Sequence, residues 1–288
     1  MIAGHQLKSY HRFIQINVID HLPVCTDAVF SYRRQLTVAS AVAQHVNSKY
    51  FYQADLLNFF KSITDKFLCS LLIKNSALFP FEASEAYLKQ IVLMVTDERV
   101  LAVGYSTSPR LSNACLYAFD IEFLQYCRSL NLVYTRYSDD FIVSGSDNAA
   151  VKMAAVKMRE ILHRFYGNVF VVNDFKTKFT KVGRKIKLLG LVILPNRTVA
   201  IDGRHKRYIE KRLYYFLTDA LRFMQLMGGD MESATSKISG HLSYVNSVDP
   251  AYLSKLRRKY GDIVDGFLYR TMDSPGIINP RVRSGTAT

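Results

Sequence analysis

Two adjacent carboxylates in an apolar stretch limit most strongly what this chain can fold into. Residues 134–144 read Tyr-Thr-Arg-Tyr-Ser-Asp-Asp-Phe-Ile-Val-Ser. Aromatic and β-branched residues favour strands and Ser-Asp-Asp favours a turn, so the stretch predicts a hairpin with Asp139 and Asp140 at its turn. Unpaired carboxylates beside apolar strands are costly. A divalent cation would relieve that cost, because Mg²⁺ prefers carboxylate oxygens; a plain polar turn is the alternative.

A second apolar segment supplies a third acid. Residues 50–60 read Tyr-Phe-Tyr-Gln-Ala-Asp-Leu-Leu-Asn-Phe-Phe, so that Asp55 ends a predicted strand. A lone Asp at a strand end commonly caps the next helix, but Asp65 is better placed for that role. Asp55 is therefore a candidate to join Asp139 and Asp140. One acid from a strand and two from a hairpin can hold two cations about 4 Å apart, as in polymerases and nucleases.

These segments resemble motifs of bacterial retron and defence-associated reverse transcriptases, which are related to group II intron enzymes. Residues 137–140 are similar to their Tyr-x-Asp-Asp box, and residues 55–60 to their first metal-binding motif. The resemblance extends from about Gln6 to Tyr269. It implies an RNA-directed DNA polymerase that binds two Mg²⁺ ions, or Mn²⁺ in their place. The implied metal ligands are Asp55, Leu56, Asp139 and Asp140, and the implied catalytic residues are Asp55, Asp139, Asp140 and Lys176.

Residues 100–113 resemble a further motif of the family, Pro-Gln-Gly-x-x-x-Ser-Pro-x-Leu-x-Asn, and lead into a predicted helix through about residue 130. Ala102 and Val103 replace Pro-Gln, which weakens the expectation of ordinary nucleotide selection and template use. Glycine permits close backbone approach to a substrate, and the N-terminus of the following helix can face phosphate. The implied nucleotide-binding residues are Phe60, Gly104, Tyr105 and Ser108.

Two of the implied roles have plainer alternatives. Phe60 matches the family's steric gate, an aromatic wall that excludes a ribose 2′-OH; alternatively, it packs in the core. Residues 173–177 follow a predicted strand at 169–172 and resemble the motif whose lysine, here Lys176, protonates the leaving pyrophosphate. A lysine near a triphosphate is a suitable acid, or it only neutralises phosphate charge. Residues 186–193 resemble the primer-grip strand, with Leu188-Leu189-Gly190 in place of the retron Val-Thr-Gly.

Basic residues concentrate after the paired acids. Residues 174–288 carry 21 Lys and Arg against 10 Asp and Glu, a net +11, whereas residues 1–173 carry 17 against 14, a net +3. Such a surplus indicates a polyanionic partner, the alternative being a solvated surface. No apolar run is long enough to cross a membrane, so we expect nucleic acid. The expected nucleic-acid-binding residues are Arg33, Arg34, Arg110, Lys206, Arg207, Lys211, Arg212, Lys255, Arg258 and Lys259.

The predicted fold is α+β, a right-hand polymerase palm of antiparallel sheet packed on helices. Residues 1–195 are expected to form truncated fingers and palm, residues 196–272 a helical thumb of three helices, and residues 273–288 a flexible tail. Related enzymes carry a basic fingertip hairpin ahead of the first residues found here. We expect its role in triphosphate binding to be supplied differently, or by another chain or RNA.

A bacterial cytoplasmic protein is expected, since the first residues do not resemble a secretion signal and the four cysteines, which lack CxxC spacing, lie in apolar surroundings typical of reduced core residues. The expected partners are an RNA template or non-coding RNA, a DNA product, deoxynucleoside triphosphates and a toxin or effector protein. The resemblance further implies a role in phage defence. Two alternatives stay open: a non-catalytic RNA-binding scaffold, and an enzyme that makes untemplated or protein-primed DNA.

Overall fold

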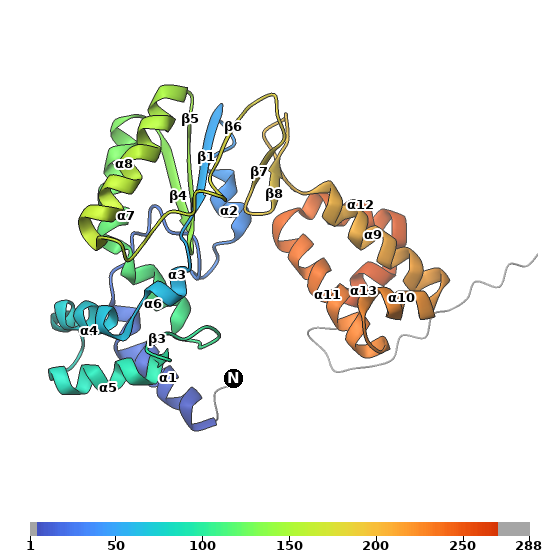
Figure 1. Ribbon diagram of the computed structural model, residues 1–288. Helices are drawn as coiled ribbons and strands as arrows, with labels where there is room; N and C mark the ends of the chain where they lie inside the picture. The colour runs from blue at the N-terminus through green and yellow to red at the C-terminus, as the bar shows by residue number, and fades with distance from the viewer. Residues whose placement is uncertain (1–4, 270–288) are drawn as a thin grey trace, which may run out of the picture. The chain divides into compact units, whose positions relative to one another are not determined.

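The computed structural model describes residues 5–269, which divide into two compact units. The first comprises residues 1–189 and the second residues 190–288; the sequence placed the boundary after residue 195. The tail expected at 273–288 lies outside the described residues. Figure 1 shows the helices and strands of both units.

An antiparallel sheet forms the centre of the first unit. Its strands, in spatial order, are β4 (Val133–Tyr137), β5 (Asp140–Gly145), β1 (Tyr50–Asp55) and β6 (Lys178–Lys181). Helices α7 (Tyr117–Ser129) and α8 (Asn148–Tyr166) cover one face, and α2 (Val38–Ala43) lies against the other (Figure 1). The predicted α+β class with an antiparallel palm is therefore confirmed.

The side-chain alternation of β4 and β5 divides their residues between the two faces. Tyr134, Phe141 and Val143 point into the apolar core beneath α7 and α8. Phe119 of α7 packs edge-to-face on Phe141 with ring centroids 5.6 Å apart. The hairpin that carries the paired acids is thus fixed to a rigid, fully packed surface.

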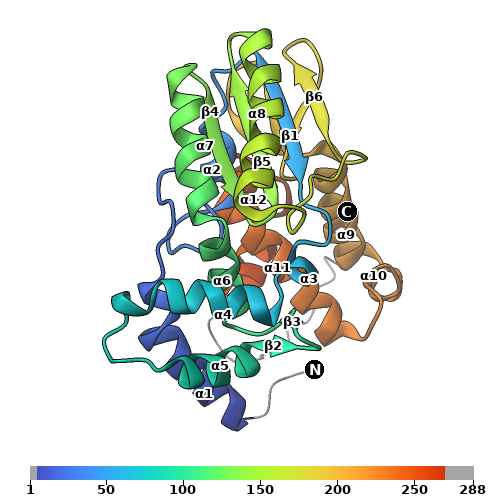
Figure 2. The same cartoon turned by 60° about the vertical axis from the view of Figure 1, so that its left-hand side comes forward.

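Below the sheet, a helical lobe surrounds the end of β1 (Figure 2). It contains α1 (His5–Asn17), α4 (Asp65–Lys74), α5 (Glu85–Val95) and the short pair β2 (Thr96–Asp97) and β3 (Val100–Leu101), with turns η1 (Ile19–His21) and η2 (Ser76–Leu78). The prediction that Asp65 caps α4 is wrong. Thr64 is the N-cap and accepts from Phe67 N, while Asp65 pairs with Arg99.

The remaining elements of the first unit are α3 (Phe59–Ser62), α6 (Ser108–Cys115) and β7 (Ile186–Leu188). The predicted single helix through residue 130 is interrupted at Leu116, between α6 and α7. The predicted strand at 169–172 is reduced to an isolated bridge between Leu56 and Val172. The predicted strand at 186–193 is also interrupted, because Leu189 and Gly190 both have positive φ and turn the chain.

The second unit is mainly helical. It begins with the hairpin of β8 (Leu191–Ile193) and β9 (Val199–Ile201) and continues through α9 (Gly203–Thr218), α10 (Ala220–Met227), α11 (Met231–Val248), α12 (Pro250–Tyr260) and α13 (Asp262–Tyr269). The expected three helices are subdivided. Asp219 ends α9 and caps α10, and Gly261, with φ of +65°, separates α12 from α13. Within the described residues, no helix is long and apolar enough to cross a membrane.

Candidate active site

The sheet register brings together the three acids that the sequence singled out. Asp55, the last residue of β1, lies opposite Asp140, the first residue of β5. Opposed residues of an antiparallel pair have Cβ atoms about 5 Å apart. Asp139 precedes Asp140 in the turn that joins β4 to β5. Three carboxylates from distant parts of the sequence therefore gather at one end of the sheet.

Asp55 is the buried member of this group, with 6% of its surface exposed. Its Oδ2 accepts a hydrogen bond from Lys176 Nζ at 2.6 Å, whereas its Oδ1 is buried and has no hydrogen-bond partner among the described residues. Two backbone hydrogen bonds hold the segment that carries Lys176 against the end of β1. Asn173 N donates to the Asp55 carbonyl, and Leu57 N donates to the Val171 carbonyl. The structure thus joins Lys176 to Asp55 as an ion pair.

The acids repel one another. The pKa of Asp140 is raised to about 6, first by desolvation and then by the negative charges of Asp139 and Asp55, against the opposing effect of Lys176. Asp140 keeps solvent contact at the start of β5. The contact with Asp55 raises the pKa of Lys176, which stabilises its charged form. Three acids and one lysine leave this end of the sheet with an excess of negative charge.

A bound cation would fit these residues. Among the described residues, no three His, Cys, Asp or Glu side chains already converge as a metal cluster. However, an unpartnered buried carboxylate oxygen and a neighbouring acid with a raised pKa are features that a cation relieves. Asp55, Asp139 and Asp140 would hold it, and the Leu56 backbone follows Asp55 directly. The site is therefore chemically suited to a divalent ion.

Comparison with known proteins identifies the family. A sequence model of the reverse transcriptase (RNA-dependent DNA polymerase) family matches residues 2–193, well over half of the chain. The chain belongs to this family.

Curated relatives narrow the type of reverse transcriptase. The Ec83 and Ec73 retron reverse transcriptases of Escherichia coli are 25% and 26% identical to the chain, over 257 and 264 residues. The alignments cover 86% and 88% of the chain, and 79% and 80% of the relatives. The Mx65 retron enzyme of Myxococcus xanthus is 25% identical over 272 residues, covering 88% of this chain and 59% of its own. The protein is therefore a reverse transcriptase of the bacterial retron type, an RNA-directed DNA polymerase.

Solved structures give a more distant likeness. Apo telomerase from Candida tropicalis, truncated of its C-terminal domain, aligns at 11% identity with a TM-score of 0.45, over 68% of this chain and 44% of its own. Telomerase from Candida albicans, in complex with a fragment of telomeric RNA, aligns at 13% identity with a TM-score of 0.46, over 91% and 48%. The chain spans about half the length of these telomerases.

The predicted nucleotide-binding residues of the reverse transcriptase have different environments. Phe60 is half-buried and contacts Phe59 edge-to-face at 5.6 Å, so it packs on the core while keeping one part exposed. Gly104, with φ of +92°, has open space where a Cβ would lie. The Tyr105 ring packs against the His11 ring, with centroids 4.7 Å apart. Ser108 is buried and donates to the Ala102 carbonyl at 2.5 Å, which ties the loop to the start of α6.

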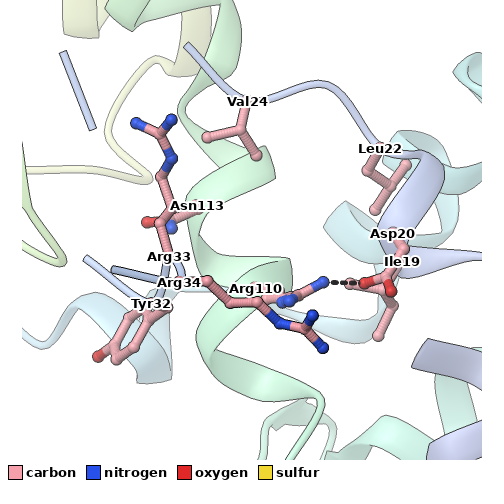
Figure 3. A pocket seen from close by; sticks show the side chains of 9 residues that line it. All are labelled: Ile19, Asp20, Leu22, Val24, Tyr32, Arg33, Arg34, Arg110 and Asn113. Carbon is pink, nitrogen blue, oxygen red and sulfur yellow. Dashed lines mark hydrogen bonds and ion pairs between the residues drawn. The ribbon is translucent and has the colours of Figure 1, made fainter. Parts of the chain in front are cut away.

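A pocket of 340 Å³ gathers three of the predicted nucleic-acid-binding residues, Arg33, Arg34 and Arg110 (Figure 3). Arg110 forms an ion pair with Asp20. Arg33 Nη1 donates to the Val29 carbonyl at 2.8 Å. Arg34 is exposed and makes no ion pair or hydrogen bond with any described residue. The pocket therefore holds one uncommitted guanidinium group beside two that are held in place.

The predicted nucleic-acid-binding residues of the second unit fall into two groups. Several of them serve the fold: Lys206 pairs with Asp249 at 3.0 Å, Lys259 pairs with Glu210 at 2.7 Å, and Arg212 lies over the Tyr208 ring and donates to its carbonyl. The others are exposed, without an ion pair or hydrogen bond to described residues: Arg207, Lys211, Lys255 and Arg258. Of these predicted residues, only the second group is available to a polyanion without breaking a contact to a described residue.

Sequence reasoning missed the polar residues that hold the hairpin. Arg136 of β4 and Asp120 of α7 form an ion pair with both side chains fully buried. His45, which follows α2, is also buried and contacts Ser144 Oγ at 2.6 Å and Thr135 Oγ1 at 2.8 Å. A signal was present, since an Arg inside an apolar strand and an Asp inside an apolar helix each need a buried partner.

Proposed function

We propose that this reverse transcriptase copies an RNA template into DNA by two-metal nucleotidyl transfer at Asp55, Asp139 and Asp140. The observation that carries the proposal is the register that sets Asp55 opposite Asp140, beside Asp139. The unpartnered Oδ1 of Asp55 supports it, because a buried carboxylate oxygen requires a cation or a donor. Mg²⁺ suits this oxygen donor set, and Mn²⁺ can replace it.

Each residue has a defined part in the proposed reaction. The three aspartates would hold and orient two divalent ions, whose charge would lower the pKa of the primer hydroxyl and stabilise negative charge on the triphosphate. Lys176 donates to Asp55 Oδ2 at 2.6 Å and so lies beside the three aspartates. Its ammonium group would donate a proton to the leaving pyrophosphate.

Substrate contacts are proposed around this centre. The exposed part of Phe60 would lie against the sugar and exclude a ribose 2′-OH, and Gly104 would permit close backbone approach. The arginine pocket, with Arg34 as its free cation, would bind phosphates of the template. Arg207, Lys211, Lys255 and Arg258 would contact a duplex backbone, which adds affinity without sequence information.

The decisive experiment replaces Asp139 with Asn and measures extension of a DNA primer on an RNA template. We expect a loss of roughly a hundredfold or more, because the change removes a charge that acts in the transition state. Asp147→Asn is the matched control, since Asp147 caps α8 and asparagine is also an effective cap. Removal of divalent ions by chelation should abolish extension by the wild-type protein and by Asp147→Asn. A wild-type rate in Asp139→Asn would refute the site.

The nucleic acid that copurifies with the protein tests template use. DNA complementary to a bound RNA would support templated synthesis. RNA alone would favour a binding scaffold, and DNA that matches no RNA would favour untemplated or protein-primed extension. This comparison is informative because Ala102 and Val103 replace the Pro-Gln that the family resemblance links to nucleotide selection and template use.

We further propose a cytoplasmic enzyme that acts in bacterial phage defence with a non-coding RNA and a toxin or effector protein. The similarity to retron enzymes supports this proposal. The test compares phage plaque numbers on cells that carry the wild-type locus with those on cells that carry Asp139→Asn. Equal plaque numbers would contradict a defence role that depends on DNA synthesis.

A further inference from the structure

A buried polar network surrounds the turn that carries the paired acids. Arg136 Nε and Nη2 both bind the Asp120 carboxylate, and neither side chain is exposed. The same guanidinium donates from Nη1 to the Ser138 carbonyl at 2.9 Å and from Nη2 to the Asn113 carbonyl at 3.1 Å. A buried charge persists only with such partners. One of these partners is the backbone of the turn itself.

Ser31 holds the other side of the same residue. Its Oγ accepts from Ser138 N at 2.9 Å and donates to Asn113 Oδ1 at 3.0 Å. Asn113 Nδ2 in turn donates to the Ser31 carbonyl at 2.9 Å. Both backbone groups of Ser138 therefore end on buried side chains. This matters because Ser138 has φ of +59°, a left-handed conformation that a non-glycine residue keeps only when its surroundings enforce it.

We propose that Arg136 and Ser31 are positioning residues for polymerisation. By fixing the backbone of Ser138, they set the direction in which Asp139 and Asp140 leave the turn toward Asp55. The inference rests on the proposed function and deepens it. Neither residue needs to contact substrate or metal, because a displacement of about 1 Å at a reacting centre can cost on the order of a hundredfold in rate.

The network contains its own control. Tyr134 OH donates to Asp120 Oδ1 at 2.7 Å and is as deeply buried as the other members. Its side chain makes no hydrogen bond to the turn. Loss of this hydroxyl and loss of the Ser31 hydroxyl each remove buried hydrogen bonds from one network. Only loss of the Ser31 hydroxyl removes a hydrogen bond to the backbone of Ser138.

The experiment compares Ser31→Ala, Arg136→Lys and Tyr134→Phe with the wild-type protein. Arg136→Lys keeps a charge for Asp120 but cannot also reach the turn. For each protein we would measure kcat and KM on a primed RNA template, the thermal midpoint, and Mn²⁺ binding by electron paramagnetic resonance without nucleotide. Asp139→Asn is included as the catalytic reference.

We expect Ser31→Ala and Arg136→Lys to lose roughly tenfold or more in kcat, with weaker Mn²⁺ binding and little change in KM. Tyr134→Phe should keep kcat and Mn²⁺ affinity within about twofold of wild type, whatever its thermal midpoint, because the turn is untouched. If Ser31→Ala behaves as Tyr134→Phe while Asp139→Asn is inactive, the network is only structural and the positioning proposal is overturned. If Asp139→Asn stays active, the proposed catalytic site fails, and the positioning proposal fails with it.

Discussion

His45 should make the stability of the first unit depend on pH. Its ring is completely buried between Ser144 of β5 and Thr135 of β4, with one nitrogen on each hydroxyl. Desolvation lowers the pKa of this imidazole from 6.5 to about 3. The folded protein therefore keeps His45 neutral over a range in which the unfolded chain takes up a proton. The stabilisation is complete above pH 6.5 and is lost as the pH falls toward 3.

The magnitude follows from the two pKa values. Between pH 8 and pH 5, proton uptake by the unfolded chain lowers the free energy of unfolding by about 2 kcal/mol, because each pH unit below the unfolded pKa costs about 1.4 kcal/mol. The assay is urea unfolding across that range. Far-UV circular dichroism serves as the probe, since the chain contains no tryptophan.

The variant His45→Gln isolates this contribution, because glutamine can hydrogen-bond but does not titrate. It should be less stable than the wild type at pH 8, and the difference should shrink by about 2 kcal/mol at pH 5. His163→Gln, at an exposed position of α8, controls for the loss of a histidine. Parallel curves for wild type and His45→Gln from pH 8 to pH 5 would refute the reasoning.

Three further predictions test other parts of the protein. Phe60→Ala should admit ribonucleotides, and unchanged selectivity in a competition assay would leave Phe60 a packing residue. Reversing Arg207 and Lys211 to Glu should lower the slope of log affinity against log salt by roughly two units; an unchanged slope would contradict a phosphate contact. Asp120→Leu or Arg136→Met alone should cost about 3–5 kcal/mol, and the double variant less than either. Additive losses in urea unfolding would exclude that coupling.

The sequence was sufficient to predict the acids and their hairpin because each signal is local. A β-branched and aromatic run, a turn tripeptide and a second run are read from neighbouring residues. The pairing of Asp55 with Asp140 is not local, and it was anticipated only through the chemistry of shared cation binding. The motif resemblance singled out Lys176 but did not predict its contact with Asp55, which the structure explains by the backbone bonds around Asn173.

Other features could not be predicted because tertiary contacts decide them. The strand expected at 169–172 is a continuous apolar run, yet it makes a single bridge, and β6 forms the sheet edge instead. The sequence also could not show which lysines and arginines form ion pairs within the fold. Lys206 and Arg207 are neighbours in sequence, but only Lys206 meets an acid, Asp249, from a helix start about forty residues away.

Buried polar contacts on both faces of β4 also explain why the hairpin adopts one register. Thr135 faces His45, and the next residue, Arg136, faces Asp120 on the opposite side of the sheet. A slip of one residue would exchange these two side chains between faces. Arg136 would then lie against the neutral imidazole, and Asp120 would be left buried and unpaired, at a cost of about 3–5 kcal/mol. Apolar packing alone would separate these registers by a smaller free-energy difference, because one apolar side chain of the strand can take the place of another in the core. The two polar contacts therefore penalise a one-residue slip of β4 away from the register that sets Tyr137 opposite Asp140.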